Sequence, residues 1–355
     1  MRAAVLIRQK EPLQIQCFKK PKPVGHQVLV RIHASGVCGA QLNEILGIKG
    51  PDLFLPHLMG HEGSGVVEAI GESVTKLKQG DRVVLHWRKA SGGEGPFPRY
   101  ETLEGQTVGG GFVTSFANMA LIAENRLTRI DDDIPFDVAC LFGCGISTGY
   151  GIVTKELKLK AGATLAVVGC GGVGLNVIQA ASLAGASQIV AVDRHNGPKE
   201  LLAKRMGATH FLLVASPDSL LAELKAQCSK GFDVVLDTTG NPRMMEEGFK
   251  ALNKSGTLML VGQPPAGTSL RIEPALDLFT GKRVLVSEGG GFDPDVDIPK
   301  LQSLYREYPT RMRQVITATF PLGDINKAID SLQTGDQGRL LLATLDESAA
   351  ETLTP

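Results

Sequence analysis

The chain has 355 residues, of which 43% are hydrophobic and 5% aromatic, with 37 basic and 37 acidic side chains. Its length exceeds that of a usual single domain, so we expect two domains. The formal net charge of zero argues against a broad basic face for nucleic acid or anionic lipid. We therefore expect a small-molecule partner, with no nucleic acid and no membrane.

The six cysteines, at positions 17, 38, 140, 144, 170 and 228, form no CxxC pair. This spacing is typical of reduced thiols or metal ligands in a long chain, and not of a disulfide framework. The N-terminal apolar run is too short for a signal peptide, and no stretch approaches the roughly 18 consecutive apolar residues of a membrane span. We expect a soluble, cytoplasmic protein.

From Met1 to about Gly145, short β-like runs such as QVLVRIHAS and DRVVLHW alternate with Gly and Pro turns, which predicts a barrel-like β domain over residues 1–145. Over 146–288, apolar strands alternate with helices, beginning with ATLAVVG. This alternation predicts an α/β domain with a doubly wound parallel sheet. We expect 289–355, which contains the strand RLLLATL, to return to the first domain and to end in a disordered polar tail.

The sequence GCGGVG at Gly169–Gly174 follows a buried strand and opens an apolar helix, the context of a dinucleotide-binding fingerprint. Gly169 permits the tight turn, Gly171 lets the backbone approach a pyrophosphate, and Gly174 lets the helix pack on the strand. The next strand ends at Asp193, where a carboxylate would bind the ribose 2′-hydroxyl and favour NAD. Arg194 leaves NADP open, because a guanidinium there would tolerate a phosphate.

Three further residues suggest a metal centre, namely Cys38 in GVC, His61 in GHEGSGVV and Cys144 in GCGISTGYG. Two thiolates and one imidazole suit zinc and would leave a fourth position open for water or substrate oxygen. Taken singly, each residue is more typical of a buried core or turn position. Their flanking sequences change that interpretation.

Those sequences, together with Val67–Val83, GCGGVG, VGQPP and the late GDQGR, closely resemble the zinc-dependent alcohol dehydrogenases of the medium-chain dehydrogenase/reductase superfamily. The resemblance runs from about Met1 to Leu345. It implies a GroES-like catalytic domain plus a Rossmann domain. It also implies association through the edge of the Rossmann sheet, as a homodimer or a tetramer.

The resemblance implies specific roles for residues of this chain. Cys38, His61 and Cys144 would be the catalytic zinc ligands, with Glu62 close to the metal. The implied coenzyme contacts are Thr148, Gly169, Gly171, Gly172, Val173, Gly174, Asp193, Arg194, Val261 and Arg339, of which Arg339 would pair with the pyrophosphate. Trp87 takes the position of an aromatic residue in the wall of the substrate pocket, which Ala40 would also line.

The chain departs from the family pattern in two places. The stretch HWRKASGGEGPFPRYETLEGQTVGGG contains no cysteine where many relatives hold a structural zinc, so we expect one catalytic zinc and no structural zinc. Ala40 and Asn43 replace the hydroxyl and imidazole of the usual proton relay, and Gln41 replaces an Asp beside the zinc-bound histidine. Proton transfer must then use another group or a water, and the candidate groups are Glu44, His57, Glu62, His86 or a hydroxyl of the substrate itself.

These observations favour a zinc-dependent oxidoreductase that transfers a hydride between NAD(H) and a secondary alcohol, a polyol or a sugar-like substrate. One alternative is a sugar or cyclitol epimerase or lyase that oxidises its substrate transiently with tightly bound NAD. A second alternative, of another class, is a catalytically silent NAD-binding protein.

Overall fold

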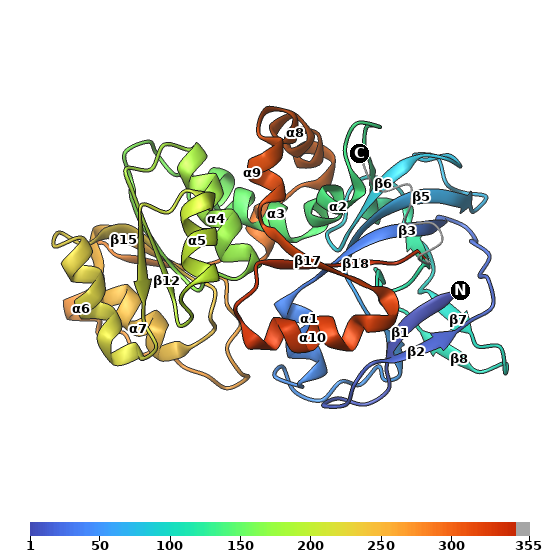
Figure 1. Cartoon of the computed structure of the whole chain (residues 1–355), viewed down its shortest axis with the longest axis horizontal. Coiled ribbons are helices and arrows are strands. Elements are labelled where there is room, and N and C mark those ends of the chain that lie inside the picture. Colours follow the sequence, from blue (N-terminus) through green and yellow to red (C-terminus); the bar gives the residue numbers. More distant parts are fainter. Residues whose placement is uncertain (346–355) are drawn as a thin grey trace. The chain divides into compact units, whose positions relative to one another are not determined.

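The computed structural model describes residues 1–345, which form two compact units (Figure 1). Unit 1 comprises Met1–Ser147, Asp293–Thr334 and the chain from Arg339 onward, and unit 2 comprises Thr148–Phe292 and Gly335–Gly338. The predicted boundaries, after residues 145 and 288, did not anticipate that Gly335–Gly338 joins unit 2. The tail that was predicted to be disordered, DESAAETLTP, lies outside the described residues.

Unit 1 contains two sheets. The larger has the order β10–β6–β5–β3–β18–β17, with β9 also paired to β3, and the smaller has the order β2–β1–β4–β8–β7. The strands of the larger sheet are β3 (Gln27–Val37), β5 (Glu62–Ile70), β6 (Arg82–His86), β9 (Met119–Ala123), β10 (Leu127–Arg129), β17 (Ile316–Pro321) and β18 (Arg339–Ala343). Those of the smaller sheet are β1 (Arg2–Leu6), β2 (Gln14–Cys17), β4 (His57–Leu58), β7 (Arg99–Glu101) and β8 (Thr107–Gly109).

The long strand β3 is the centre of unit 1. Its side chains alternate between two apolar clusters, since Val28, Val30 and Ile32 pack in one and Leu29 packs in the other. The strand has neighbours on both sides, β5 and β18, and both run antiparallel to it. The ends of β5 and β18 that come first in the chain therefore lie beside the end of β3, where the metal-site residues of the sequence prediction cluster.

Helical segments of unit 1 cover the sheets and shape the ends of the strands. They are α1 (Gly39–Ile45), η1 (Glu124–Arg126), α2 (Phe136–Ala139), η2 (Cys140–Gly143), α8 (Pro294–Glu307), α9 (Pro309–Arg313), η6 (Leu322–Asp324) and α10 (Ile325–Thr334). Helix α3 (Gly145–Gly151) begins in unit 1 and ends in unit 2, where the π-helical turn η3 (Ile152–Glu156) follows it.

Unit 2 is a six-stranded sheet in the order β13–β12–β11–β14–β15–β16, in which every pairing is parallel. Its strands are β11 (Thr164–Val168), β12 (Gln188–Asp193), β13 (His210–Leu213), β14 (Phe232–Asp237), β15 (Leu252–Leu260) and β16 (Arg283–Val286). Its helical segments are α4 (Gly172–Leu183), α5 (Pro198–Met206), α6 (Pro217–Gln227), α7 (Pro242–Lys250), η4 (Pro274–Leu278) and η5 (Gly289–Gly291).

The order of the strands in unit 2 reverses beside β11. Helices α4 and α5 lie on one face of the sheet and α6 and α7 on the other (Figure 1). After β11 the chain forms β12 and β13 on one side of β11. It then crosses over and forms β14, β15 and β16 on the other side of β11. Ligands of doubly wound sheets bind at the carboxyl ends of the two strands that flank this reversal. The predicted doubly wound sheet is confirmed, and its glycine motif follows β11, at the reversal.

Within the described residues, no single helix is long and apolar enough to cross a membrane. One bent pair of short helices, Phe136–Gly143 and Gly145–Glu156, reaches that length and composition only when the two are taken together. Most of their residues are buried in the protein, as expected for core helices.

Candidate functional site

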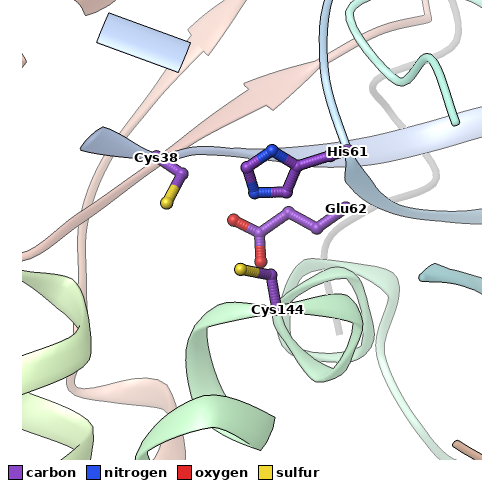
Figure 2. A group of neighbouring side chains, drawn as sticks. All are labelled: Cys38, His61, Glu62 and Cys144. Atoms are coloured by element: carbon purple, nitrogen blue, oxygen red, sulfur yellow. The ribbon is translucent and has the colours of Figure 1, made fainter. Parts of the chain in front are cut away.

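Four side chains from three separate segments converge in unit 1 (Figure 2). Cys38 follows β3, His61 and Glu62 stand at the start of β5, and Cys144 precedes α3. The antiparallel pairing of β3 with β5 brings the first three together although 23 residues separate Cys38 from His61 in the sequence. The candidate ligand atoms of the four side chains all lie within 4.8 Å of one another.

The donor set of this cluster fits a zinc ion. Two cysteine sulfurs and an imidazole are the ligands that zinc prefers in proteins. Nε2 of His61 is buried and has no hydrogen-bond partner, which costs free energy unless a further group engages that nitrogen. A cation held by Cys38, His61 and Cys144 would satisfy the nitrogen. Glu62 offers a fourth ligand atom.

The Cys38 thiol is poised to lose its proton. Its hydrogen bond with Cys144 holds the pKa of Cys38 well below that of an ordinary thiol, and the nearby Arg339 and His61 act in the same direction against the effect of burial. The thiolate is the form that binds metal ions. The environment of Cys38 therefore favours metal binding before any ion arrives.

Glu62 and Arg339 form a buried ion pair, since Glu62 is fully buried and the Arg339 side chain is 3% exposed. The second carboxylate oxygen of Glu62 accepts a hydrogen bond from the backbone N–H of Gly145, at 3.0 Å. A Cβ atom at Gly36 would lie 2.4 Å from the Glu62 carboxylate, so glycine leaves the room that the pair needs. The structure thus places Arg339 beside the metal-site cluster, and its predicted contact with a pyrophosphate stays a prediction.

Gln41 connects the cluster to helix α1. Its side-chain oxygen accepts a hydrogen bond from the backbone N–H of Cys38, at 2.9 Å, and so closes the first turn of the helix. Its side-chain nitrogen lies 2.5 Å from Nδ1 of His61. Gln41 is 1% exposed, so water does not compete for either contact.

The residues that were predicted to handle the substrate lie in the same unit. Ala40 is partly exposed on the first turn of α1 and carries no polar group. Trp87 follows β6, its carbonyl oxygen accepts a hydrogen bond from Arg126, and the Arg88 guanidinium lies 5.2 Å from the centre of its ring. The assignment of Ala40 and Trp87 to a substrate pocket stays a prediction.

The structure separates the candidate proton acceptors. His86 is buried with its ring nitrogens engaged by the carbonyl of Arg88 and the hydroxyl of Thr128, and burial lowers its pKa to about 4. His57 instead belongs to a group with Glu44 and Asp52, because its Nε2 lies 2.9 Å from an Asp52 oxygen and 3.6 Å from a Glu44 oxygen.

The sequence analysis missed Asp52. It lies in the loop between α1 and β4, and only the fold shows that this loop returns to His57. Nδ1 of His57 faces the backbone oxygen of Leu58 at 2.9 Å, so both ring nitrogens of His57 face acceptors. Glu44 is the most exposed member of this group.

The glycine loop of unit 2 has the geometry that was predicted from its sequence. Gly169 has a φ of +96°, which favours glycine. A Cβ atom at Gly171 would meet nothing within 4 Å, which leaves this backbone open to a ligand. A Cβ atom at Gly174 would lie 2.0 Å from the Gly169 carbonyl oxygen, so only glycine fits there. Gly172 and Val173 form the first turn of α4, and the N–H groups of a first helical turn favour an anion.

The Asp193 carboxylate is fixed at the end of β12. Its two oxygens accept hydrogen bonds from the backbone N–H groups of Cys170, at 2.8 Å, and His195, at 3.0 Å. Each oxygen keeps a lone pair for a ribose hydroxyl. The Arg194 side chain donates to the His195 ring, at 3.0 Å.

Lys199 is a second residue that the sequence analysis missed. It is 1% exposed, and its ammonium group donates to the carbonyl oxygens of Cys170, at 2.8 Å, and of Gln337. Burial lowers the pKa of Lys199, against the opposing effect of Asp193. The contact with Gln337 explains why Gly335–Gly338 belongs to unit 2. In the sequence, Lys199 had the appearance of an ordinary first-turn residue of a surface helix.

The two remaining coenzyme candidates also lie in unit 2. Val261 follows β15, and its backbone N–H donates to the carbonyl oxygen of Asp237, at 2.9 Å. Thr148 lies in α3 and is 5% exposed. Their contact with a nicotinamide stays a prediction.

Comparisons with known proteins agree with both units. The family model of the alcohol dehydrogenase GroES-like domain matches residues 25–132, and that of the zinc-binding dehydrogenases matches residues 172–304. The probable S-(hydroxymethyl)glutathione dehydrogenase 1 of Schizosaccharomyces pombe is 33% identical, over 94% of this chain and 94% of the relative.

Two solved structures extend the match to three dimensions. A zinc-binding alcohol dehydrogenase domain protein from Burkholderia ambifaria superposes with a TM-score of 0.88 at 30% identity, over 97% of this chain and 99% of that one. Benzyl alcohol dehydrogenase from Acinetobacter calcoaceticus gives a TM-score of 0.85 at 30% identity, with the same coverage. The resemblance and the predicted fold class are confirmed. The chain therefore belongs to the zinc-dependent alcohol dehydrogenases of the medium-chain dehydrogenase/reductase superfamily, a family of NAD-linked oxidoreductases.

Proposed function

We propose that this chain interconverts an alcohol and its carbonyl compound, with zinc held by Cys38, His61 and Cys144 and with NAD(H) held by unit 2. The observation that carries the proposal is the convergence of these three side chains around a buried, unpartnered imidazole nitrogen. A zinc ion in this position would act as a Lewis acid on the substrate oxygen.

The chain's own groups prepare the centre for this role. The depressed pKa of Cys38 supplies a thiolate ligand without help from a base. Arg339 neutralises Glu62, so that carboxylate adds no net charge to a cluster that already holds thiolates. We infer one catalytic zinc and no structural zinc, because the segment 86–111 contains no cysteine.

In unit 2 we assign the pyrophosphate to the open backbone at Gly171 and the first turn of α4. Asp193 would accept hydrogen bonds from a ribose 2′-hydroxyl, and its negative charge disfavours a 2′-phosphate, so NAD is the proposed coenzyme. Arg194 is exposed beside it, and its replacement by Ala tests whether any NADP use depends on this guanidinium. Bound NAD would accept the hydride from the carbinol carbon.

The substrate proton needs an acceptor other than the relay that Ala40 and Asn43 lack. His86 is excluded by its buried hydrogen bonds, and Glu62 is occupied by Arg339. This leaves the group around His57 among the described residues, a second hydroxyl of the substrate, or a water. The second possibility is the reason to include polyols and sugars among the candidate substrates.

The experiment measures zinc content and NADH formation on one panel of alcohols. The panel contains benzyl alcohol and S-(hydroxymethyl)glutathione, the substrates in the names of two relatives, with secondary alcohols, polyols and sugars. Removal of zinc by a chelator should abolish turnover, and zinc should restore it. Full activity in a protein that contains no metal would refute the proposal.

The missing relay also favours a second candidate, a sugar or cyclitol epimerase or lyase that retains NAD. This activity would form product without added coenzyme, and NAD would remain bound through purification. If neither is observed, the second candidate is wrong. A catalytically silent protein is disfavoured by the family and by the complete ligand set.

We propose that two copies associate through the outer strand β16 of unit 2. This strand has one neighbour in the sheet, Val286 at its end is 77% exposed, and the nearby Phe279 is 87% exposed. An edge strand with exposed apolar side chains is a ready template for pairing with a second copy. Val286→Lys should convert the dimer to a monomer in analytical ultracentrifugation, and an unchanged mass would contradict this assignment.

The cytoplasm is the proposed location. None of the six cysteines forms a disulfide in the structure, and the proposed metal ligands must stay reduced. Fractionation of cells that express the chain would test this assignment.

A further inference from the structure

We propose that Gln41 lowers the affinity of the Cys38, His61 and Cys144 cluster for a metal ion. The reason is that Gln41 stabilises the tautomer of His61 that carries its proton on Nε2. The inference rests on the proposed zinc site. It concerns the hydrogen-bond geometry of Cys38, Gln41 and His61, in which one amide serves two partners.

The orientation of the Gln41 amide follows from its contact with the backbone. The N–H group of Cys38 can only donate, so the amide atom that faces it at 2.9 Å must be the oxygen. The –NH₂ group of Gln41 therefore faces Nδ1 of His61, at 2.5 Å. This orientation also completes the cap of α1, so two independent requirements fix it.

The amide orientation in turn determines the tautomer of His61. An –NH₂ group can only donate, so Nδ1 of His61 must be the acceptor. A neutral ring with an accepting Nδ1 carries its proton on Nε2. That nitrogen is the one that lies in the cluster, buried and without a hydrogen-bond partner. The metal-free protein therefore satisfies the contact with Gln41 and places the Nε2–H group among the candidate ligand atoms.

Metal binding reverses this arrangement. A metal ion takes the lone pair of Nε2, and the proton of the neutral ring then belongs on Nδ1. The Nδ1–H group would face the –NH₂ group of Gln41, donor against donor. Rotating the amide by half a turn corrects this contact but sets the –NH₂ group against the N–H of Cys38. No orientation of one amide satisfies both partners, whereas a carboxylate would accept from both.

Gln41→Glu is the direct test. The variant keeps the size and the capping interaction and supplies an acceptor to each partner. We expect zinc to bind at least tenfold more tightly, within the ten- to hundredfold range of outer-shell partners of metal-bound histidines. The dissociation constant is measured by competition with a chromophoric chelator, and this readout does not depend on turnover.

The matched control is Asn43→Asp, which adds the same charge on the same helix, two residues farther along. We expect less than a threefold change in the zinc dissociation constant for this variant. Equal tightening in both variants would reduce the effect to general charge and overturn the proposal. Equal affinities of the wild type and Gln41→Glu would also overturn it.

A second measurement needs no variant. In wild-type protein with ¹⁵N-labelled histidine, the His61 signals should show a proton on Nε2 without metal and on Nδ1 after zinc is added. A proton on Nδ1 in the metal-free protein would overturn the proposal. Failure of the proposed function looks different, because zinc would then bind and shift these signals while no alcohol was oxidised.

Discussion

Replacing Glu62 by Gln would remove the negative charge that faces the Arg339 guanidinium. The two side chains are 0% and 3% exposed, so water and salt do not screen the charge that remains. Arginine keeps its charge at any accessible pH and cannot relieve the loss by giving up a proton. We therefore expect the metal-free protein to lose about 3–5 kcal/mol of unfolding free energy, the usual cost of removing one partner of a buried pair.

The double replacement Glu62→Met with Arg339→Met should recover most of this loss. Apolar side chains of similar volume often replace a buried ion pair without net cost. The comparison of the double variant with the two single variants separates the interaction of the pair from other effects of each substitution. A control is Glu11→Gln, which breaks the exposed pair of Arg8 and Glu11 and should cost less than about 1 kcal/mol.

The assay is equilibrium unfolding in urea, followed by the fluorescence of Trp87. This residue is the only tryptophan of the chain and it lies in unit 1, so the signal reports on the unit that contains the pair. Chelator-treated protein is used because Glu62 also offers a metal ligand. A loss below about 1 kcal/mol for Glu62→Gln would refute the reasoning from burial, as would a double variant no more stable than the weaker single variant.

Three further outcomes follow from the structure. Gly171→Ala should fold with unchanged thermal stability but bind NAD more weakly by isothermal titration, because its Cβ atom meets only open space, whereas Gly174→Ala should unfold. Burial raises the pKa of Asp237 from 3.8 to about 6, so unit 2 should lose stability as the pH rises through this window. Asp237→Asn should flatten that dependence in the hydrogen exchange of β14. The lowered pKa of His86, about 4 instead of 6.5, acts in the opposite direction. Unit 1 should lose stability as the pH falls through that range, and His86→Gln should reduce the loss in the Trp87 signal.

Much of the fold and of the site could be predicted because the relevant signals are local. Gly174 must be glycine because its backbone lies close to Gly169, five residues earlier. The GCGGVG motif contains both residues, so the sequence alone predicts this contact. The parallel sheet was predictable from continuous apolar runs, since strands that are covered on both faces do not alternate apolar with polar residues. The convergence of Cys38, His61 and Cys144 was predictable because each residue stands in a distinctive sequence, although none of them was convincing alone.

The unpredicted contacts join residues that are far apart in the sequence. Arg339 reaches Glu62 because β18 pairs with β3 in a register that places Leu340 opposite Val37. The sequence indicated a strand near Arg339 but contained no information on this register. Lys199 is a similar case, because a lysine in a first helical turn is usually exposed, whereas this one is buried and donates to the distant Gln337.

The segment that lacks the zinc-binding cysteines is held by a buried carboxylate. Glu124 is fully buried, and one of its oxygens faces His26 at 2.7 Å and Gly93 N–H at 2.9 Å, while the other accepts from Thr75 and Lys76 at 3.0 and 3.1 Å. Burial alone would raise the pKa of Glu124, but these donors lower it below its ordinary value. Glu124 thus ties the loop around Gly93 to two other segments of unit 1.

From this arrangement we expect the segment to keep its structure without a metal ion. Removal of zinc by a chelator should leave the hydrogen exchange of residues 90–96 unchanged. Glu124→Gln should accelerate it about 5- to 150-fold, because the new –NH₂ group faces backbone donors and about 1–3 kcal/mol of hydrogen bonding is lost. The stabilisation by Glu124 is complete at neutral pH and disappears as the pH falls through its lowered pKa, so acid should open the wild-type segment in the same way. Opening by the chelator alone would show that a metal ion orders this segment after all, and the carboxylate would then be a secondary support.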